Sequence, residues 1–99
     1  MTATVTYGTW AQYTGELSVE WTVKISLGEW AEDYDLGAIT TEYRQAIDHE
    51  LGLCRDIPEG FSLVGDEIHG PHPRIDNVDL VPVLRAVDFW AIASKHEKR

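Results

Sequence analysis

Four side chains that could bind a metal or transfer protons stand close together in the second half of the chain. They are Asp66, Glu67, His69 and His72. Carboxylates and imidazoles are ligands of divalent metals and act as general acids and bases. If residues 60–69 form a strand, Glu67 and His69 share a face, because side chains two apart point the same way. The spacing matches no established metal motif, so a solvated strand end is the competing interpretation.

The single cysteine, Cys54, follows His49 by five residues, which invites a thiol–imidazole pair. A reactive thiolate usually lies at a helix N-terminus or beside a cation, either of which lowers the pKa of the thiol. Cys54 instead follows the expected end of a helix, where the dipole disfavours an anion, and Arg55 offsets this only in part. We therefore expect Cys54 to be a small packing residue.

Aromatic residues among acidic ones form the strongest candidate for a binding surface, because exposed aromatics are typical anchors of protein interfaces. The candidate partner-binding residues are Trp10, Glu20, Glu29, Trp30, Glu32, Asp33, Tyr34 and Asp35. Four of these carboxylates fall within residues 29–35, and a basic partner would relieve their mutual repulsion. In the alternative interpretation, Trp30 covers the open end of the core and Trp10 packs beneath a terminus.

The most regular pattern in the sequence is the alternation of apolar and polar residues over 3–27, which is typical of half-buried strands. Both halves of this stretch are rich in Val, Thr, Tyr and Trp, which favour strands. The pattern predicts an antiparallel hairpin with a three-residue loop at 13–15 and Gly15 in a left-handed conformation.

This loop length sets the expected register of the hairpin. Gln12 faces Glu16, and Tyr7 lies opposite Trp21, so that apolar residues meet on one face. The same register places Trp10 on the outer face of the sheet.

A helix is expected next, over about 40–51, where apolar residues follow helical spacing. Thr40 or Thr41 is a suitable N-cap, although the helix could start as early as Asp35. Gly52 fits the left-handed stop position at the end.

Two more elements complete the expected set. A third strand over 60–69 has its alternation interrupted by Gly65, which predicts a bulge. A final helix over about 79–96 tolerates Pro82 in its first turn. The predicted fold class is α+β over 1–99 as a single domain: two layers, with an antiparallel three-stranded sheet and two helices on one face, in the order β-β-α-β-α.

A second copy of the chain is one candidate partner, bound through a sheet edge or the last helix. Val81, Phe89 and Ile92 fall outside the main apolar stripe of that helix. We expect a dimer contact or the connection over 70–78 to cover them.

The charge balance restricts the other partners. The chain has 17 acidic and 8 basic residues, a net charge of −9 at pH 7, and three of the basic residues lie in the last five positions. Such a chain repels nucleic acids and anionic membranes. No apolar run approaches the roughly 20 residues of a membrane span, and the first residues lack the pattern of a signal peptide. We therefore expect a cytoplasmic protein with no direct nucleic-acid or membrane contact.

Together these observations predict a small acidic protein that binds a protein with a basic surface, as inhibitors, immunity proteins and nucleic-acid mimics do. We expect a binding protein and not an enzyme, with no cofactor. The alternative is a small enzyme or a ligand- or metal-binding domain that uses the cluster Asp66, Glu67, His69 and His72.

Overall fold

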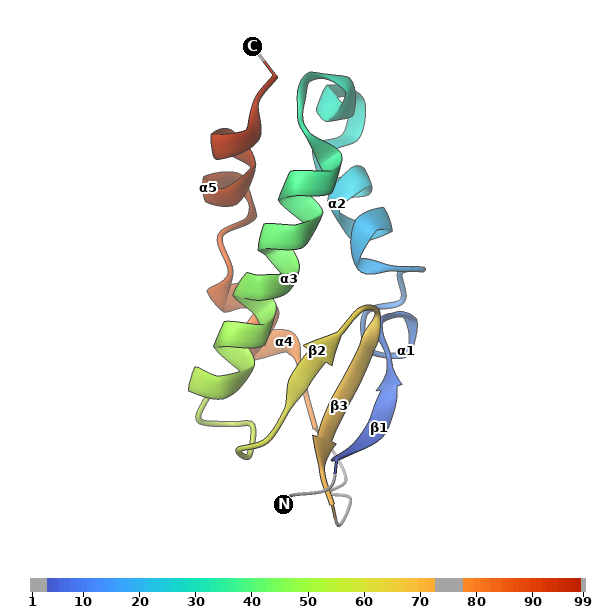
Figure 1. Cartoon of the computed structure of the whole chain (residues 1–99), viewed down its shortest axis with the longest axis vertical. Coiled ribbons are helices and arrows are strands. Elements are labelled where there is room, and N and C mark those ends of the chain that lie inside the picture. The colour runs from blue at the N-terminus through green and yellow to red at the C-terminus, as the bar shows by residue number, and fades with distance from the viewer. Residues whose placement is uncertain (1–3, 73–77, 99) are drawn as a thin grey trace.

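The computed structural model describes residues 4–72 and 78–98. A three-stranded antiparallel sheet is combined with helices, which confirms the predicted α+β class (Figure 1). The molecule is elongated, with extents of 47 × 23 × 23 Å, and the sheet occupies one end of it.

The order of the elements differs from the predicted order β-β-α-β-α, because helical segments stand between the first two strands. The elements are β1 (Thr4–Thr9), α1 (Trp10–Thr14), α2 (Val19–Leu27), the 3-10 helix η1 (Gly28–Asp33), α3 (Leu36–Leu53), β2 (Ser62–Val64), β3 (Glu67–Pro71), α4 (Val81–Ala86), α5 (Phe89–Ala93) and the 3-10 helix η2 (Ser94–His96). Strand β3 lies between β1 and β2 in the sheet.

The second strand of the predicted hairpin is wrong, because residues 19–27 form the helix α2. Side chains two residues apart share a face in a strand but lie about 200° apart around a helix. Helix formation therefore divides the alternating apolar residues into two opposite sets. Buried in the core are Val19, Val23 and Leu27, and exposed on the other side are Trp21, Ile25 and the preceding Leu17.

The predicted hairpin register is wrong for the same reason. Strand β1 pairs with β3, so Gln12 does not face Glu16 and Tyr7 does not lie opposite Trp21 in a sheet. Gly15 does have the predicted left-handed conformation, with φ of 80°, but it ends the helix α1 and not a hairpin loop. A left-handed glycine serves either structure equally well.

Trp10 is fully buried, so its predicted place on an outer sheet face is wrong. The chain turns from β1 into α1 through a capping box, in which Thr9 and Gln12 satisfy each other's backbone N–H groups. The backbone N–H of Trp10 donates to the carbonyl of Asp66 at 2.7 Å, and its indole Nε1–H donates to Thr22 Oγ1 at 2.7 Å. These contacts fix the indole inside the core.

The predicted strand over 60–69 is two strands, β2 and β3, joined by a turn at Gly65 and Asp66. Gly65 has a φ of 62°, so the predicted bulge at this residue is instead a turn. The irregularity in the sheet falls elsewhere, between Thr6 and Gly8 in the pairing of β1 with β3.

Gly70 in β3 lies where two aromatic rings meet the sheet. An added Cβ atom would lie 2.5 Å from ring carbons of both Phe61 and Tyr7. These two rings pack edge-to-face with centroids 4.7 Å apart. Only glycine leaves enough room for this contact.

Helix α3 confirms the early start allowed for the predicted helix over 40–51, because Asp35 caps it and accepts a backbone N–H from the first turn. Thr40 and Thr41 lie inside the helix and donate their hydroxyl protons to carbonyls four residues earlier, so they are not caps. Gly52 is also helical, and its predicted left-handed stop is wrong.

The predicted single helix over 79–96 is wrong, because the chain leaves the helical conformation at Val87 and starts α5 with Asp88 as N-cap. The break turns the following residues toward the core. Ile92 is buried, and Phe89 packs edge-to-face on Tyr43. Its own chain, and not a second copy, therefore covers this part of the segment.

The start of the predicted helix over 79–96 is confirmed in one respect, the position of Pro82. Pro82 lies in the first turn of α4, where its missing N–H is tolerated. Val81 remains exposed.

Helix α3 is the central element, with α2 on one side and α4 and α5 on the other (Figure 1). It also packs on β2. The core joins α2 and α3 to the sheet and includes Ile39, Ile47, Leu51 and Ile68. The described chain does not show the predicted arrangement of two helices that cover one face of the sheet. Helices α2, α3 and α5 instead extend well beyond the sheet.

Candidate functional site

Seven of the eight predicted partner-binding residues lie at the molecular surface. Glu20 is exposed on α2, and the other six, Glu29, Trp30, Glu32, Asp33, Tyr34 and Asp35, lie in η1 or directly after it. Trp10 is the exception, because it is buried in the core.

Gly28 separates α2 from η1. Its φ of 58° and ψ of −128° are easily adopted only by glycine, and its N–H still donates to the Lys24 carbonyl. The chain therefore changes direction and forms η1 at the end of the molecule opposite the sheet (Figure 1).

The end of the described chain returns to η1 and pairs with it. Asp35 N–H donates to the His96 carbonyl at 2.9 Å, and Lys98 N–H donates to the Asp33 carbonyl at 2.8 Å. Tyr34 and Glu97 form an antiparallel bridge between them. Segments about 60 residues apart in sequence thus become neighbours.

A second set of contacts ties this returning segment to α3. Glu42 accepts hydrogen bonds from Lys95 Nζ and His96 Nε2, both at 3.1 Å. The hydrogen bonds from His96 and Lys95 lower the pKa of Glu42 below its ordinary value of 4.5. These hydrogen bonds therefore stabilise the folded chain fully when the pH is above 4.5, the ordinary pKa of the Glu42 carboxyl. Their contribution is lost as the pH falls through the lower pKa that Glu42 has in the folded state.

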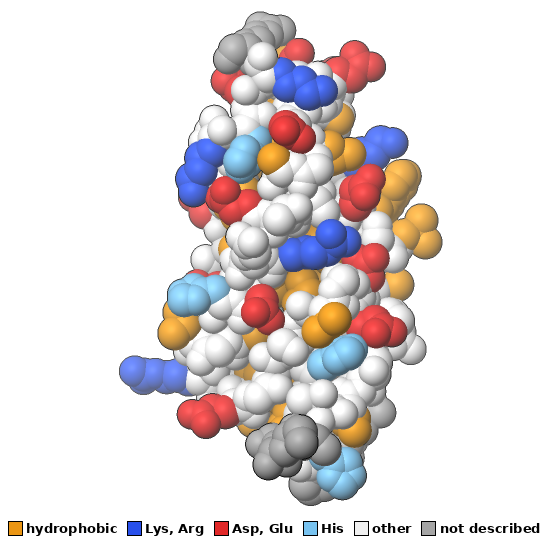
Figure 2. Space-filling model, in the orientation of Figure 1, with side chains coloured by type: hydrophobic (Ala, Val, Ile, Leu, Met, Phe, Trp, Pro, Cys, Tyr) orange, Lys and Arg blue, Asp and Glu red, His pale blue; other side chains and the backbone are white. Residues whose placement is uncertain are grey.

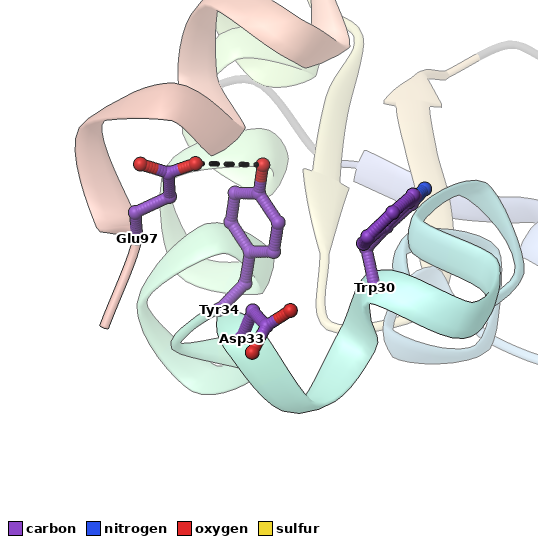
Figure 3. A pocket seen from close by; sticks show the side chains of 4 residues that line it. All are labelled: Trp30, Asp33, Tyr34 and Glu97. Atoms are coloured by element: carbon purple, nitrogen blue, oxygen red, sulfur yellow. Dashed lines mark hydrogen bonds between the residues drawn. The ribbon is translucent and has the colours of Figure 1, made fainter. Parts of the chain in front are cut away.

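The pairing creates a small open hollow between two aromatic rings (Figure 3). Trp30, Asp33, Tyr34 and Glu97 line it, and its empty space is about 370 Å³ including the part open to solvent. The rings of Trp30 and Tyr34 stand on the same side of η1, and the Asp33 carboxylate lies near the base of the Tyr34 side chain. The Tyr34 hydroxyl donates to Glu97 Oε1 at 3.2 Å.

The Tyr34 side of the hollow is held by a series of edge-to-face ring contacts that leads into the core. Tyr34 packs on Trp90, Trp90 on Phe89, Phe89 on Tyr43, and Tyr43 on the buried Trp10, with centroid distances from 5.4 to 6.5 Å. Such pairs stabilise a fixed arrangement beyond their buried area. Trp30 is less constrained, with 55% of its surface exposed.

The charges around the hollow favour a cation. Desolvation raises the pKa of Tyr34, and the hydrogen bond and charge of Glu97 and the charge of Asp33 raise it further, so the phenol is neutral and donates its proton. The hollow therefore presents two carboxylates, a neutral phenol and an exposed indole face. Guanidinium and ammonium groups bind both carboxylates and indole rings.

The cluster proposed as an alternative metal or acid–base site is divided by the fold. Asp66 Oδ1 accepts hydrogen bonds from the backbone N–H of Val19 at 2.9 Å and from Arg44 Nη2 at 3.2 Å. Glu67 and His69 share a face as predicted and lie 3.2 Å apart at their side-chain atoms. Within residues 4–72 and 78–98, no group of three or more His, Cys, Asp or Glu side chains could hold a metal ion.

The thiol is a packing residue. Cys54 directly follows α3, is half-buried and packs against the core, which confirms the expectation for this residue. His49 is exposed on α3.

Two parts of the surface are missing from the sequence prediction. Glu97 and Trp90 join the η1 end only through long-range packing, and no local pattern marks them. The exposed apolar residues of α2 could have been found, because Ser18 is a good N-cap and residues 19, 23 and 27 follow helical spacing. Hydrophobic side chains gather along the α2 side of the molecule (Figure 2).

Comparison of the chain with protein-family models, curated proteins and solved structures found no match. None of the helices in the described residues is both long enough and apolar enough to pass through a bilayer. These comparisons identify no ligand. What the site can bind is therefore inferred from the residues that line it.

Proposed function

We propose that this protein is a small acidic cytoplasmic interaction module that binds a basic segment of another protein. The hollow formed by Trp30, Asp33, Tyr34 and Glu97 receives an arginine or lysine side chain of that segment. One observation carries this proposal: two aromatic rings and two carboxylates surround a single open hollow.

Arginine suits this arrangement better than lysine. Its planar guanidinium stacks on an indole and donates several hydrogen bonds in one plane, whereas the ammonium of lysine is a point charge. Asp33 and Glu97 supply the acceptors, and Trp30 supplies the exposed ring face. An inserted arginine would thus be recognised by shape as well as by charge.

The surrounding charge supports binding of a longer basic segment. Glu29, Glu32 and Asp35 are exposed beside the hollow, and the whole chain has a net charge of −9. Such a field accelerates association with cationic partners and makes the rate sensitive to salt. The acidic residues would then control the rate of association, while Trp30 would control the lifetime of the complex.

A direct test uses a short capped peptide with one arginine and its citrulline counterpart, which has nearly the same shape without the charge. Titrated into isotope-labelled protein, the arginine peptide should shift the NMR signals of the Trp30 indole and of Tyr34. The citrulline peptide should give much smaller shifts, because it cannot form the charged contacts.

Matched variants locate the effect. Glu97→Gln keeps a hydrogen-bond acceptor for Tyr34 but removes one charge, and Trp30→Ala removes the ring face, so both should reduce binding of the arginine peptide. Glu67→Gln removes an exposed charge on β3 and should leave the binding unchanged. Equal shifts with both peptides, or the same loss in Glu67→Gln as in Glu97→Gln, would contradict the proposed site.

A basic protein partner adds a kinetic test. Replacing Glu32 and Asp33 by Lys should slow association at low salt, and Trp30→Ala should chiefly speed dissociation. Unchanged association by the lysine variant, with a folded far-UV circular dichroism spectrum, would argue against this surface.

A further inference from the structure

The outer side of α2 carries Trp21 and Ile25, and Leu17 directly precedes the N-cap of the helix; these three residues are defined here as the apolar stripe. Their exposed fractions are 77% for Leu17, 40% for Trp21 and 52% for Ile25, although the opposite side of the same helix is fully packed in the core. The described residues leave this stripe open to solvent. An apolar helix face of this kind is typical of a protein–protein contact.

The charges beside the stripe are arranged on one flank only. With about 100° between successive residues of a helix, Glu20 and Lys24 both fall on the same side of Trp21. Both are exposed, and Lys24 Nζ lies 5.7 Å from the centroid of the Trp21 ring. The other flank has no charged residue: it carries the N-cap Ser18 and then the buried Thr22.

We propose that the apolar stripe joins two copies of this chain, with their α2 helices packed antiparallel around a two-fold axis. An axis that passes beside Trp21 brings the two copies of this ring together and sets Leu17 close to Ile25 of the second copy. In such a pair each flank faces its own equivalent. Glu20 of each copy then meets Lys24 of the other, so the surface is complementary to itself in charge as well as in hydrophobicity.

Other arrangements fit these charges less well. In a parallel pair, the flank with Glu20 and Lys24 would face the other flank, which has no charged residue, and neither charge would gain a partner. A strongly basic partner would be repelled by Lys24, which lies beside Trp21 on the charged flank. The net charge of −9 on each copy makes the two copies repel each other, but salt screens this repulsion over about 8 Å at physiological ionic strength.

The decisive experiment measures the dimer dissociation constant of the full chain and its charge variants by sedimentation equilibrium. Glu20→Lys and Lys24→Glu should each weaken self-association about tenfold, because each turns two attractive contacts into two repulsive ones. An equimolar mixture of the two variants should form a mixed dimer, since opposite charges then face each other. The double variant Glu20→Lys, Lys24→Glu should regain the affinity of the parent.

The direction of the Glu20→Lys effect separates local pairing from overall repulsion. This change lowers the net negative charge by two, so overall repulsion alone would strengthen the dimer. Local pairing predicts a weaker dimer. A stronger dimer in Glu20→Lys would therefore overturn the proposed antiparallel contact.

Apolar variants complete the test. The pair Leu17→Ser, Ile25→Ser should abolish self-association with little change in far-UV circular dichroism, because both residues are exposed. Leu53→Ser, at the equally exposed end of α3, should leave the dimer intact. A parent chain that stays monomeric at millimolar concentration, or a dimer that survives the stripe variants, would overturn the proposal.

This inference does not rest on the hollow between Trp30 and Tyr34. Failure of the arginine peptide to bind would leave the dimer measurements unaffected, and a monomeric parent would leave the peptide titration unaffected.

Discussion

Residues 17–27 and residues 60–71 both alternate apolar and polar side chains, yet the first stretch contains a helix and the second a strand pair. In the second stretch, a left-handed Gly65 reverses the chain, and β3 gains strand partners on both of its edges. In the first stretch, Ser18 accepts the Trp21 N–H and starts a helix. The two stretches therefore differ in the residues that direct the backbone: Gly65 interrupts the alternation of one, and Ser18 precedes the other.

The two stretches also differ in how much apolar surface they can bury. A strand places all alternating apolar residues on one face, whereas a helix sends them to two opposite faces. Helix α2 therefore buries Val19, Val23 and Leu27 and exposes Trp21 and Ile25. An alternating sequence that folds as a helix therefore leaves an apolar stripe exposed on one side of that helix.

The largest expected effect is the difference in the free energy of unfolding between a Trp10 variant and a Trp21 variant. Trp10→Ala should destabilise the fold by about 3–5 kcal/mol, because Trp10 is fully buried. Trp21→Ala should cost below about 1 kcal/mol, because it is a surface change. Urea unfolding followed by circular dichroism gives both values.

If Trp10→Ala leaves too little folded protein to measure, Trp10→Phe keeps much of the apolar volume but loses the hydrogen bond to Thr22. A larger loss in Trp21→Ala than in either Trp10 variant would be the pattern of a strand and would refute the helix.

The next effect concerns the strand pair. Gly70→Ala should destabilise by about 1–3 kcal/mol, because the new methyl group would overlap the rings of Phe61 and Tyr7. Gly52→Ala is its control: it lies in α3 with no atom within 4 Å of the new Cβ, and it should stabilise by about 0.5–1 kcal/mol. Equal effects of the two changes would show that the rings do not close over Gly70.

The smallest expected change in stability concerns Asp66, which connects the turn between β2 and β3 to the start of α2. Asp66, in the turn before β3, accepts backbone N–H groups at the start of both α1 and α2. Asp66→Ala keeps the carbonyl contact to α1 but removes the side-chain contacts to the Val19 N–H of α2 and to Arg44, and should cost about 0.5–2 kcal/mol. Glu67→Ala, next in the chain and exposed, is the control. Thermal unfolding with no difference between the two variants would contradict the capping role.

Local signals explain which parts of the fold could be predicted. The start of α3 at Asp35, the left-handed Gly15 and the place of Pro82 follow from single residues with strong backbone preferences. The break at Val87 was not predicted, because apolar residues keep helical spacing across it; the N-cap Asp88, which accepts the Ala91 N–H, is the one local signal at this point.

The candidate site shows the same division. The acidic and aromatic residues in and directly after η1 are evident in the sequence, and the structure leaves most of them exposed. Glu97 lies beside Tyr34 only because the end of the described chain returns to η1. Trp10 is buried because α2 packs over it, with Thr22 accepting its indole N–H. Contacts at such sequence separation have no local signature.

The most direct test of the central claim, that residues 19–27 form a helix and not a strand, is solvent exchange of the tryptophan indole N–H groups in isotope-labelled protein. The indole N–H of Trp10 is buried and donates to Thr22 Oγ1, whereas the Trp21 side chain is 40% exposed. We predict slow exchange for Trp10 and fast exchange for Trp21. Slow exchange of Trp21 with fast exchange of Trp10 is what the hairpin would give, and it would contradict the helix and the apolar stripe derived from it.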